Sequence, residues 1–496
     1  MQFLSTSCII GNGNESEKMK FEDFQLDTTI LEALDKLGYA EPLPVQEEVI
    51  PLILEGKNVI VKSKTGSGKT ASFAIPVIEN IIWDERDPQC LVLTPTRELA
   101  LQIKEEFDNI GAYKRLKSAA IFGKQPYRFQ VQDLKQRCHV VVGTPGRILD
   151  HLQRGTLKLE NIKTCIIDEA DEMLNMGFID NVKEIMNYFP GNLTTCLFSA
   201  TYPPAIQELA TSFIPNAQMV EIASTHAVTE LVTHYAYRMK EHEKLDFLIK
   251  LLCQLQPASC IIFAKTQEHV KEVCDALYKL DLSVDKIHGG MLQEDRMDNL
   301  NDFKKGKLRI LVATDVAARG IDIKDVSHII NYDMPNQAET YVHRLGRSGR
   351  VNASGVAISL IAQYDDARVA ALEEFLNEPL NVKDTKEILE VIVSEQALEG
   401  LRHPIEIKEE KGKELRKDTM KIYLNGGKSK KIRAGDIVGA ICEIEGVTGD
   451  DIGVIQIQDR QSYVDILHGK GQKVLKALQK KTIKGKQLKV QKAKDD

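Results

Sequence analysis

The stretch that decides the fold is residues 58–70 (NVIVKSKTGSGKT), where a short apolar run meets a glycine-rich loop. Glycines let such a loop curl between a strand and a helix so that its backbone N–H groups face phosphate oxygens. The Lys69 ammonium can then reach the β- and γ-phosphates of a nucleotide, and the Thr70 hydroxyl can ligate Mg²⁺. Ser63 stands where the strict pattern has glycine, so the loop alone leaves open a glycine-rich turn that carries a lysine by chance.

A second stretch, further along the chain, supports the first. Residues 164–167 (TCII) run directly into Asp168-Glu169-Ala170-Asp171. A carboxylate at the end of a buried strand can hold the Mg²⁺ of a bound nucleotide, and a second acid stands beside it. Together the two stretches predict an NTP-hydrolysing site.

Apolar runs rich in β-branched residues alternate with amphipathic segments across residues 58–200, and a similar series recurs across residues 259–360. This alternation is typical of a parallel sheet with crossover helices. We therefore predict an α/β fold with two parallel-sheet units joined near residues 215–229. Since only the first unit contains a phosphate loop, the second must contribute something else to the site. The predicted strands are 89–94, 139–144, 164–168 and 196–200 in the first unit, and 259–264, 309–314, 327–332 and 355–360 in the second.

The bulk composition is that of a globular protein, with 43% hydrophobic and 28% charged residues among 496. No stretch approaches the length of a membrane span, and the first residues lack the basic region of a secretory signal. The nine cysteines include no C-x-x-C pair, which favours a reduced cytoplasm over a disulfide framework. We expect residues 1–18 to be a disordered extension and Met19 to open the folded part.

The C-terminal part has its own charge and its own pattern. Residues 420–496 hold sixteen Lys/Arg and nine Asp/Glu, although the whole chain carries −7. This asymmetry favours a surface that faces nucleic acid, and a solvated lysine-rich face is the alternative. The order of elements expected from Met420 onward is β-α-β-β-α-β, the ferredoxin-like arrangement. The expected domains are 19–215, 225–376 and 419–496, with a charged linker at 377–418.

Beyond the phosphate loop, the chain carries a long ordered series of short motifs, and their order and identity resemble the DEAD-box RNA helicases over residues 20–375. The motifs of the first unit are Gly38-Tyr39-Ala40-Glu41-Pro42 with Gln46, PTRELA at 95–100, TPGR at 144–147, DEAD at 168–171 and SAT at 199–201. Those of the second are FAKT at 263–266, QEDR at 293–296, ATDVAARGID at 313–322 and HRLGRSGR at 343–350.

The resemblance implies two RecA-like domains, ATP and Mg²⁺ as cofactors, RNA as the partner, and a role for each matching residue. The implied catalytic residues are Lys69, Asp168, Glu169, Arg347 and Arg350. ATP binding is implied for Phe21, Tyr39, Gln46, Ser63, Lys64, Thr65, Gly66, Ser67, Gly68, Lys69, Thr70 and Asp322. Mg²⁺ would be held by Thr70 and Asp168, partly through water. Coupling between ATP and RNA is implied for Asp171, Ser199, Thr201 and His343, and RNA contacts for Thr96, Arg97, Gly146, Arg147, Arg296 and Thr314.

The C-terminal segment narrows the resemblance. Residues 424–433 (LNGGKSKKIR) and 485–490 (GKQLKV) look like the C-terminal, RRM-like module of the DbpA/YxiN branch, whose members recognise a hairpin of the large-subunit ribosomal RNA. Gln461 and Ile466 stand where this kind of module usually carries stacking rings, so we expect the RNA contacts at Lys428, Lys430, Lys431 and Arg433 instead.

The resulting hypothesis is an ATP-dependent RNA helicase of the cytoplasm that unwinds or remodels short duplexes. Its expected partner is a 23S rRNA hairpin or a pre-large-subunit particle. Two alternatives stay open: a general RNA remodeller, and an ATP-gated RNA clamp that does not separate strands. The sequence identifies no protein partner.

Overall fold

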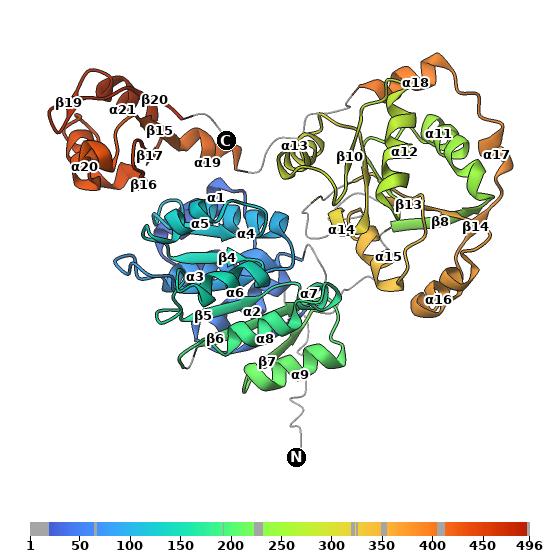
Figure 1. Cartoon of the computed structure of the whole chain (residues 1–496), viewed down its shortest axis with the longest axis horizontal. Coiled ribbons are helices and arrows are strands. Elements are labelled where there is room, and N and C mark those ends of the chain that lie inside the picture. Colours follow the sequence, from blue (N-terminus) through green and yellow to red (C-terminus); the bar gives the residue numbers. More distant parts are fainter. Residues whose placement is uncertain are drawn as a thin grey trace.

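The computed structural model describes residues 19–63, 67–191, 193–222, 232–318, 323, 326–348, 355–403 and 412–493. Three bodies follow one another along the chain: two α/β domains and a small C-terminal domain (Figure 1). The predicted extension at residues 1–18 lies outside the described residues.

The first domain is built on a parallel sheet of seven strands in the order β3-β4-β2-β5-β6-β1-β7. Alternate residues of each strand face opposite sides, so Val59 and Val61 join one core while Ile60 joins the other. Helices α1–α4 cover the first side, and α6–α9 cover the second. The strands are β1 (Val59–Lys62), β2 (Cys90–Leu93), β3 (Ser118–Ile121), β4 (Val140–Gly143), β5 (Thr164–Ile167), β6 (Thr194–Ser199) and β7 (Gln218–Glu221). The helices are η1 (Phe21–Phe24), α1 (Thr28–Lys36), α2 (Pro44–Leu54), α3 (Lys69–Asn80), α4 (Arg97–Ile110), α5 (Tyr127–Leu134), α6 (Pro145–Gln153), α7 (Ala170–Asn175), α8 (Ile179–Met186) and α9 (Pro204–Phe213).

The second domain repeats this architecture with the strand order β10-β11-β9-β12-β13-β8-β14, again all parallel. Its strands are β8 (Val232–Arg238), β9 (Cys260–Phe263), β10 (Val284–Ile287), β11 (Ile310–Ala313), β12 (His328–Asn331), β13 (Gly355–Ile361) and β14 (Val382–Lys383). Its helices are η2 (Glu241–Glu243), α11 (Lys244–Leu255), α12 (Gln267–Tyr278), α13 (Gln293–Lys304), α14 (Asp315–Ala318), α15 (Ala338–Leu345), α16 (Asp366–Leu376), α17 (Lys386–Leu389) and α18 (Glu395–Arg402). The predicted pair of parallel-sheet units is confirmed.

The prediction of a charged linker at residues 377–418 is wrong up to residue 403, because this part of the chain is folded onto the second domain. Strand β14 pairs with β8, and Ile388, Leu398 and Leu401 are buried in the core beside α11. Arg309 fixes the end of this segment, because its guanidinium donates to backbone carbonyls of both Gly400 and His403. The charged side chains of Lys386, Glu387, Glu395 and Glu399 on α17 and α18 are exposed, and their density in the sequence concealed the buried face of these helices.

The C-terminal domain has the predicted β-α-β-β-α-β order, and its four-stranded antiparallel sheet runs β16-β17-β15-β20. Helices α20 and α21 cover one face of this sheet. The elements are α19 (Lys413–Asp418), β15 (Met420–Leu424), η3 (Lys428–Lys430), α20 (Ala434–Cys442), η4 (Gly449–Asp451), β16 (Ile452–Ile457), β17 (Ser462–Ile466), α21 (Gly471–Leu478), β18 (Thr482–Ile483), β19 (Lys486–Gln487) and β20 (Val490–Lys492). Among the helices of the described residues, none is long and apolar enough to cross a bilayer.

Candidate nucleotide and RNA site

The phosphate loop leads from β1 into α3, and its described part is Ser63 and Ser67–Thr70. Lys69 is buried at the start of α3, where its ammonium donates to the backbone carbonyl of Ser63 at 3.0 Å. Gly68 has a φ of +94°, and a Cβ there would lie 2.7 Å from Leu43 and 2.8 Å from the amide of Gln46. The backbone therefore has this path only because residue 68 is glycine. Lys64, Thr65 and Gly66 lie outside the described residues.

Two carboxylates stand at the end of β5, beside the loop. Asp168 and Glu169 are both buried, and Glu169 has a positive φ of 52° at the start of α7. Burial, together with the charge of Asp168, raises the pKa of Glu169 to about 7, although Lys69 and Arg347 oppose the shift. Burial also raises the pKa of Asp168. Such a buried acidic pair is incompletely compensated by the cations around it, so a further cation fits here.

The residues expected at the adenine base lie on α2 and the segments around α1. The Gln46 amide accepts from the Leu43 backbone N–H at 2.8 Å and donates to the Gly68 carbonyl at 3.2 Å. It thus ties α2 to the phosphate loop and keeps one N–H for a ligand. Phe21 and Tyr39 pack edge to face with centroids 6.1 Å apart, and the Tyr39 hydroxyl bonds Glu106.

Three of the residues expected to couple ATP to RNA, Asp171, Ser199 and Thr201, meet where the adjacent strands β5 and β6 of the first sheet end. One carboxylate oxygen of Asp171 accepts from the Thr201 backbone N–H at 2.9 Å and from the Thr201 hydroxyl at 3.0 Å. The Ser199 hydroxyl donates to the Thr201 carbonyl at 2.6 Å and accepts from the Asp171 backbone N–H at 3.3 Å. The turn after β6 is therefore bonded to the helix that begins beside the paired acids.

The second domain contacts the region around the paired acids through α15. His343 lies 3.1 Å from the buried carboxylate of Glu172, and Arg347 is close enough to lower the pKa of Glu169. Arg344, between them, is buried and pairs with Asp315 at 2.6 Å, which anchors α15 to its own domain. Asp322 and Arg350, both predicted for the site, lie outside the described residues.

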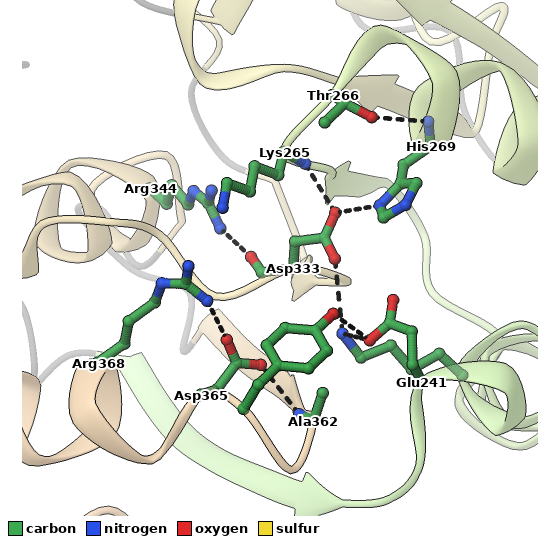
Figure 2. Close-up of polar contacts among 11 residues, drawn as sticks. Glu241, Lys265, Thr266, His269, Asp333, Arg344, Ala362, Asp365 and Arg368 are labelled. Carbon is green, nitrogen blue, oxygen red and sulfur yellow. Dashed lines mark hydrogen bonds and ion pairs between the residues drawn. The ribbon is translucent and has the colours of Figure 1, made fainter.

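Asp333 is the centre of a polar cluster that sequence reasoning missed (Figure 2). It accepts from the Lys265 backbone N–H and from His269, both at 2.8 Å, while its own carbonyl accepts from Arg344 at 2.9 Å. Burial raises the pKa of the Asp333 carboxyl, but the hydrogen bonds from Lys265 and His269 and the nearby Lys244 ammonium lower it by more. Fully buried Lys244 also lies 2.9 Å from the Glu241 carboxylate. Its ammonium is therefore the cation that balances the carboxylates of this cluster. We interpret it as the support that holds α15 against β9 and β12.

The residues expected to contact RNA lie after strand ends or in the first turns of helices in both domains. In the first domain, Thr96 caps α4, and Arg147 donates to the Gln125 carbonyl and the Gln130 side chain at 3.2 and 3.1 Å. A Cβ at Gly146 would meet open space, so a ligand could approach this backbone closely. In the second domain, Thr314 is buried after β11.

One contact between the domains involves two residues to which we assigned no role. Gln293 accepts from Arg97 at 3.1 Å and donates to Glu98 at 2.8 Å, and Arg296 lies 3.3 Å from the same Glu98 carboxylate. Arg296 of the second domain thus pairs with Glu98 of the first, and Gln293 links Arg97 to the same carboxylate. The motifs PTRELA and QEDR contained this signal, but nothing in the sequence pairs one with the other.

The basic loop of the C-terminal domain, which we define as residues 425–433 with Lys484 and Lys486, is assembled from two segments. The Lys484 and Lys486 ammonium groups donate to the carbonyls of Lys431 and Lys430 at 2.9 and 2.6 Å. Gly427 allows the loop to turn, because a Cβ there would lie 2.1 Å from the Gln458 carbonyl. The predicted cations Lys428, Lys431 and Arg433 are exposed, whereas Lys430 is half-buried and donates to the Asn425 carbonyl.

The sheet of this domain offers few rings for stacking. Tyr423 and Tyr463 contact each other with centroids 5.7 Å apart, and the Gln461 amide donates to the Tyr463 hydroxyl at 3.0 Å. Ile466 is buried in the core.

Three family models match the chain: DEAD/DEAH box helicase over residues 43–209, helicase conserved C-terminal domain over 243–352, and DbpA RNA binding domain over 421–492. The ATP-dependent RNA helicase DbpA of Bacillus subtilis (strain 168) is 50% identical over 474 residues, which cover 95% of this chain and 99% of that protein. The DEAD-box ATP-dependent RNA helicase CshA of Geobacillus kaustophilus is 40% identical over a region that covers 77% of this chain and 80% of that protein. Among solved structures, S. cerevisiae Dbp5 bound to RNA and ADP BeF3 is similar with a TM-score of 0.68 and 30% identity, over 77% of this chain and 99% of that one.

Proposed function

Because this chain belongs to the DEAD-box ATP-dependent RNA helicases of the DbpA type, we propose that it remodels short duplexes in 23S ribosomal RNA during assembly of the large ribosomal subunit. The observation that carries the proposal is the basic loop, which gathers cations of two segments on the domain matched by the DbpA RNA-binding model. A hairpin of the pre-large-subunit particle is the partner that this loop would hold.

In the proposed ATPase, Lys69 binds the phosphates and Glu169 orients and polarises the attacking water. A carboxylate with a pKa of about 7 is suited to accept a proton near neutral pH. Arg347, which follows α15 and is close enough to lower the pKa of Glu169, stabilises the charge that develops on the γ-phosphate, and Arg350 joins it. Gln46, Phe21 and Tyr39 hold the base.

The donors around the paired acids also fit Mg²⁺, since the hydroxyl of Thr70 and the carboxylate of Asp168 are the hard oxygen ligands that this ion prefers. When bound, Mg²⁺ would neutralise the phosphate charge as it develops. Asp168 would hold the ion, and Thr70 would fix its position at the start of α3.

RNA binding is divided between the core and the tail in this proposal. Contacts of Arg97, Arg147 and Arg296 with phosphates carry no sequence information, so they serve any duplex. Preference for one hairpin then has to come from the basic loop. We place the protein in the cytoplasm, where the unpaired cysteine thiols of the described residues are stable.

The experiment compares ATPase stimulation and strand displacement by a ribosomal hairpin RNA and an unrelated hairpin of equal length. Replacing Lys428, Lys430, Lys431 and Arg433 by Gln should remove the preference for the ribosomal RNA. It should also make the salt dependence of RNA binding shallower, by about 0.7 in the log–log slope for each lost phosphate contact. The matched control replaces four exposed lysines outside the loop, Lys473, Lys476, Lys480 and Lys492, and should keep the preference.

Two outcomes would contradict the proposal. Equal stimulation of the unaltered protein by both RNAs would identify a general remodeller. ATP-dependent binding without release of strands would identify an RNA clamp.

A further inference from the structure

A surface on the first domain meets the C-terminal domain. It is formed by the end of α1, the end of α4 and the loop at residues 111–117. Tyr113, in that loop, is only 7% exposed, and its hydroxyl donates to the Asp418 carboxylate at 2.5 Å. Arg115 donates to the Gly449 carbonyl at 2.7 Å. Both side chains thus end on groups of the C-terminal domain.

The opposing surface of the C-terminal domain fits these groups closely. The His468 ring stacks on Tyr113, with centroids 5.4 Å apart and ring planes inclined by 2°. Asp451, itself buried, holds His468 at 2.9 Å and Lys470 at 2.7 Å, so the stacking ring is oriented from within its own domain. A ring that is fixed before contact loses little conformational freedom when the two surfaces meet.

Apolar burial accompanies these polar contacts. Leu415 of α19 and Leu467 of the segment after β17 pack with Ala33 and Tyr113 into a separate small core. Both leucines are almost completely buried. Figure 1 shows α19 lying over the first domain near α1. The contact therefore extends from the linker helix to the body of the C-terminal domain, which a freely tethered module would not show.

The electrostatics agree with this burial. Asp465, on β17, has its pKa raised to about 6 by burial and by the charge of Asp108 on α4, although Lys421 opposes the shift. Arg416 of α19 lies 3.5 Å from Glu105, also on α4. Charges of the two domains thus influence each other along the last two turns of α4.

Arg97 and the basic loop both lie away from this contact. Strand β15 begins beside the contact and leads to the basic loop. Its five residues, at 3.3 Å each, span about 16 Å. Helix α4 begins at Arg97 and ends beside Tyr113, and its fourteen residues span about 21 Å.

We propose that Tyr113 and Arg115 form a docking surface that fixes the RNA-binding domain to the first RecA-like domain through Asp418, Gly449 and His468. A hairpin held by the basic loop then keeps a constant position relative to the RNA contacts of the first domain. ATP-driven movement of the second domain would act on a duplex that is already in register.

Hydrogen exchange measured by mass spectrometry on the full chain, without RNA, tests the docking. Tyr113→Ala should increase exchange of residues 447–470 in the C-terminal domain by at least about tenfold, and His468→Ala should do the same for residues 110–118 in the first. The effect of each substitution on hydrogen exchange is measured in the domain that does not contain it. Local damage around the new alanine therefore does not produce the signal. Tyr188→Ala, at an exposed tyrosine of the first domain, is the matched control and should change neither segment.

The double variant should show no larger effect than either single variant, because either one already separates the surfaces. Effects confined to the substituted domain would overturn the proposal.

A second measurement tests the consequence for RNA, and it rests on the proposed function. With an RNA that joins the ribosomal hairpin to a duplex, Tyr113→Ala should raise the RNA concentration for half-maximal ATPase by about tenfold, since the effective concentration of the duplex falls. The rate at saturating RNA and the affinity for the hairpin alone should stay unchanged. If hydrogen exchange rises in the unaltered domain for both variants but the RNA concentration for half-maximal ATPase does not change, the two domains dock, and docking does not position the duplex. Loss of hairpin preference in the unaltered protein would instead refute the proposed function.

Discussion

Glu169→Gln separates the electrostatic state of the site from its chemistry. The pKa of Glu169 is about 7, which lies about 2.5 above the ordinary value of 4.5. At 1.36 kcal/mol for each pH unit, keeping this carboxylate ionised in the folded domain costs up to about 3 kcal/mol. Glutamine has nearly the same shape and carries no charge, so the variant avoids that cost.

The direction of the pH effect follows from the sign of the shift. Below pH 4.5 the carboxyl is protonated in both the folded and the unfolded chain, and it contributes no difference in stability. As pH rises towards 7, only the unfolded chain ionises freely, so the unaltered protein loses stability. Above pH 7 the loss is complete. The variant should therefore be more stable than the unaltered protein at pH 8, and the difference should disappear towards pH 4.5.

Urea unfolding of the nucleotide-free proteins at pH 5 and pH 8, followed by a probe in the first domain, measures this difference. ATPase assays at pH 8 should show turnover abolished in the variant, while ATP binding and the RNA-bound closed state persist. The control is Glu184→Gln, at a carboxylate on α8 away from the site. A stability difference that is the same at both pH values would refute the electrostatic reasoning, and near-normal ATPase would remove Glu169 from the role of base.

Three further substitutions test the other parts of the site. Lys69→Ala should weaken ATP binding measured by calorimetry, because the ammonium over the loop is lost; unchanged affinity would contradict its role at the phosphates. Arg347→Ala should leave ATP affinity intact but lower RNA-stimulated turnover by about 10³-fold or more, as loss of an arginine finger does, and an equal fall of the basal rate would argue against a role that depends on domain closure. Asp171→Asn should uncouple strand displacement from ATP hydrolysis, since the Thr201 bonds to the carboxylate weaken; parallel loss of both activities would indicate a merely structural contact.

Much of the architecture could be predicted because short stretches of neighbouring residues indicate it. Buried parallel strands such as β2 and β11 read as continuous apolar runs, and the phosphate loop follows β1 directly. The alternation of the C-terminal domain likewise predicted the order of its elements. Each of these signals lies within a few neighbouring residues.

The features that escaped prediction are contacts between distant segments. Gln293 and Glu98 are 195 residues apart, and no periodicity relates them. Lys484 and Lys486 join the basic loop only because the chain folds back beside it. The docking of Tyr113 against His468 depends on how two finished domains meet, which no local pattern encodes.

Identification of the RNAs that crosslink to the full chain in growing cells tests the central claim most directly. The account predicts that crosslinks at the basic loop concentrate on one hairpin of the large-subunit ribosomal RNA. In the variant with Lys428, Lys430, Lys431 and Arg433 replaced, crosslinks of the core should persist but spread over unrelated RNAs. An even spread of crosslinks over cellular RNAs in the unaltered protein would contradict the account.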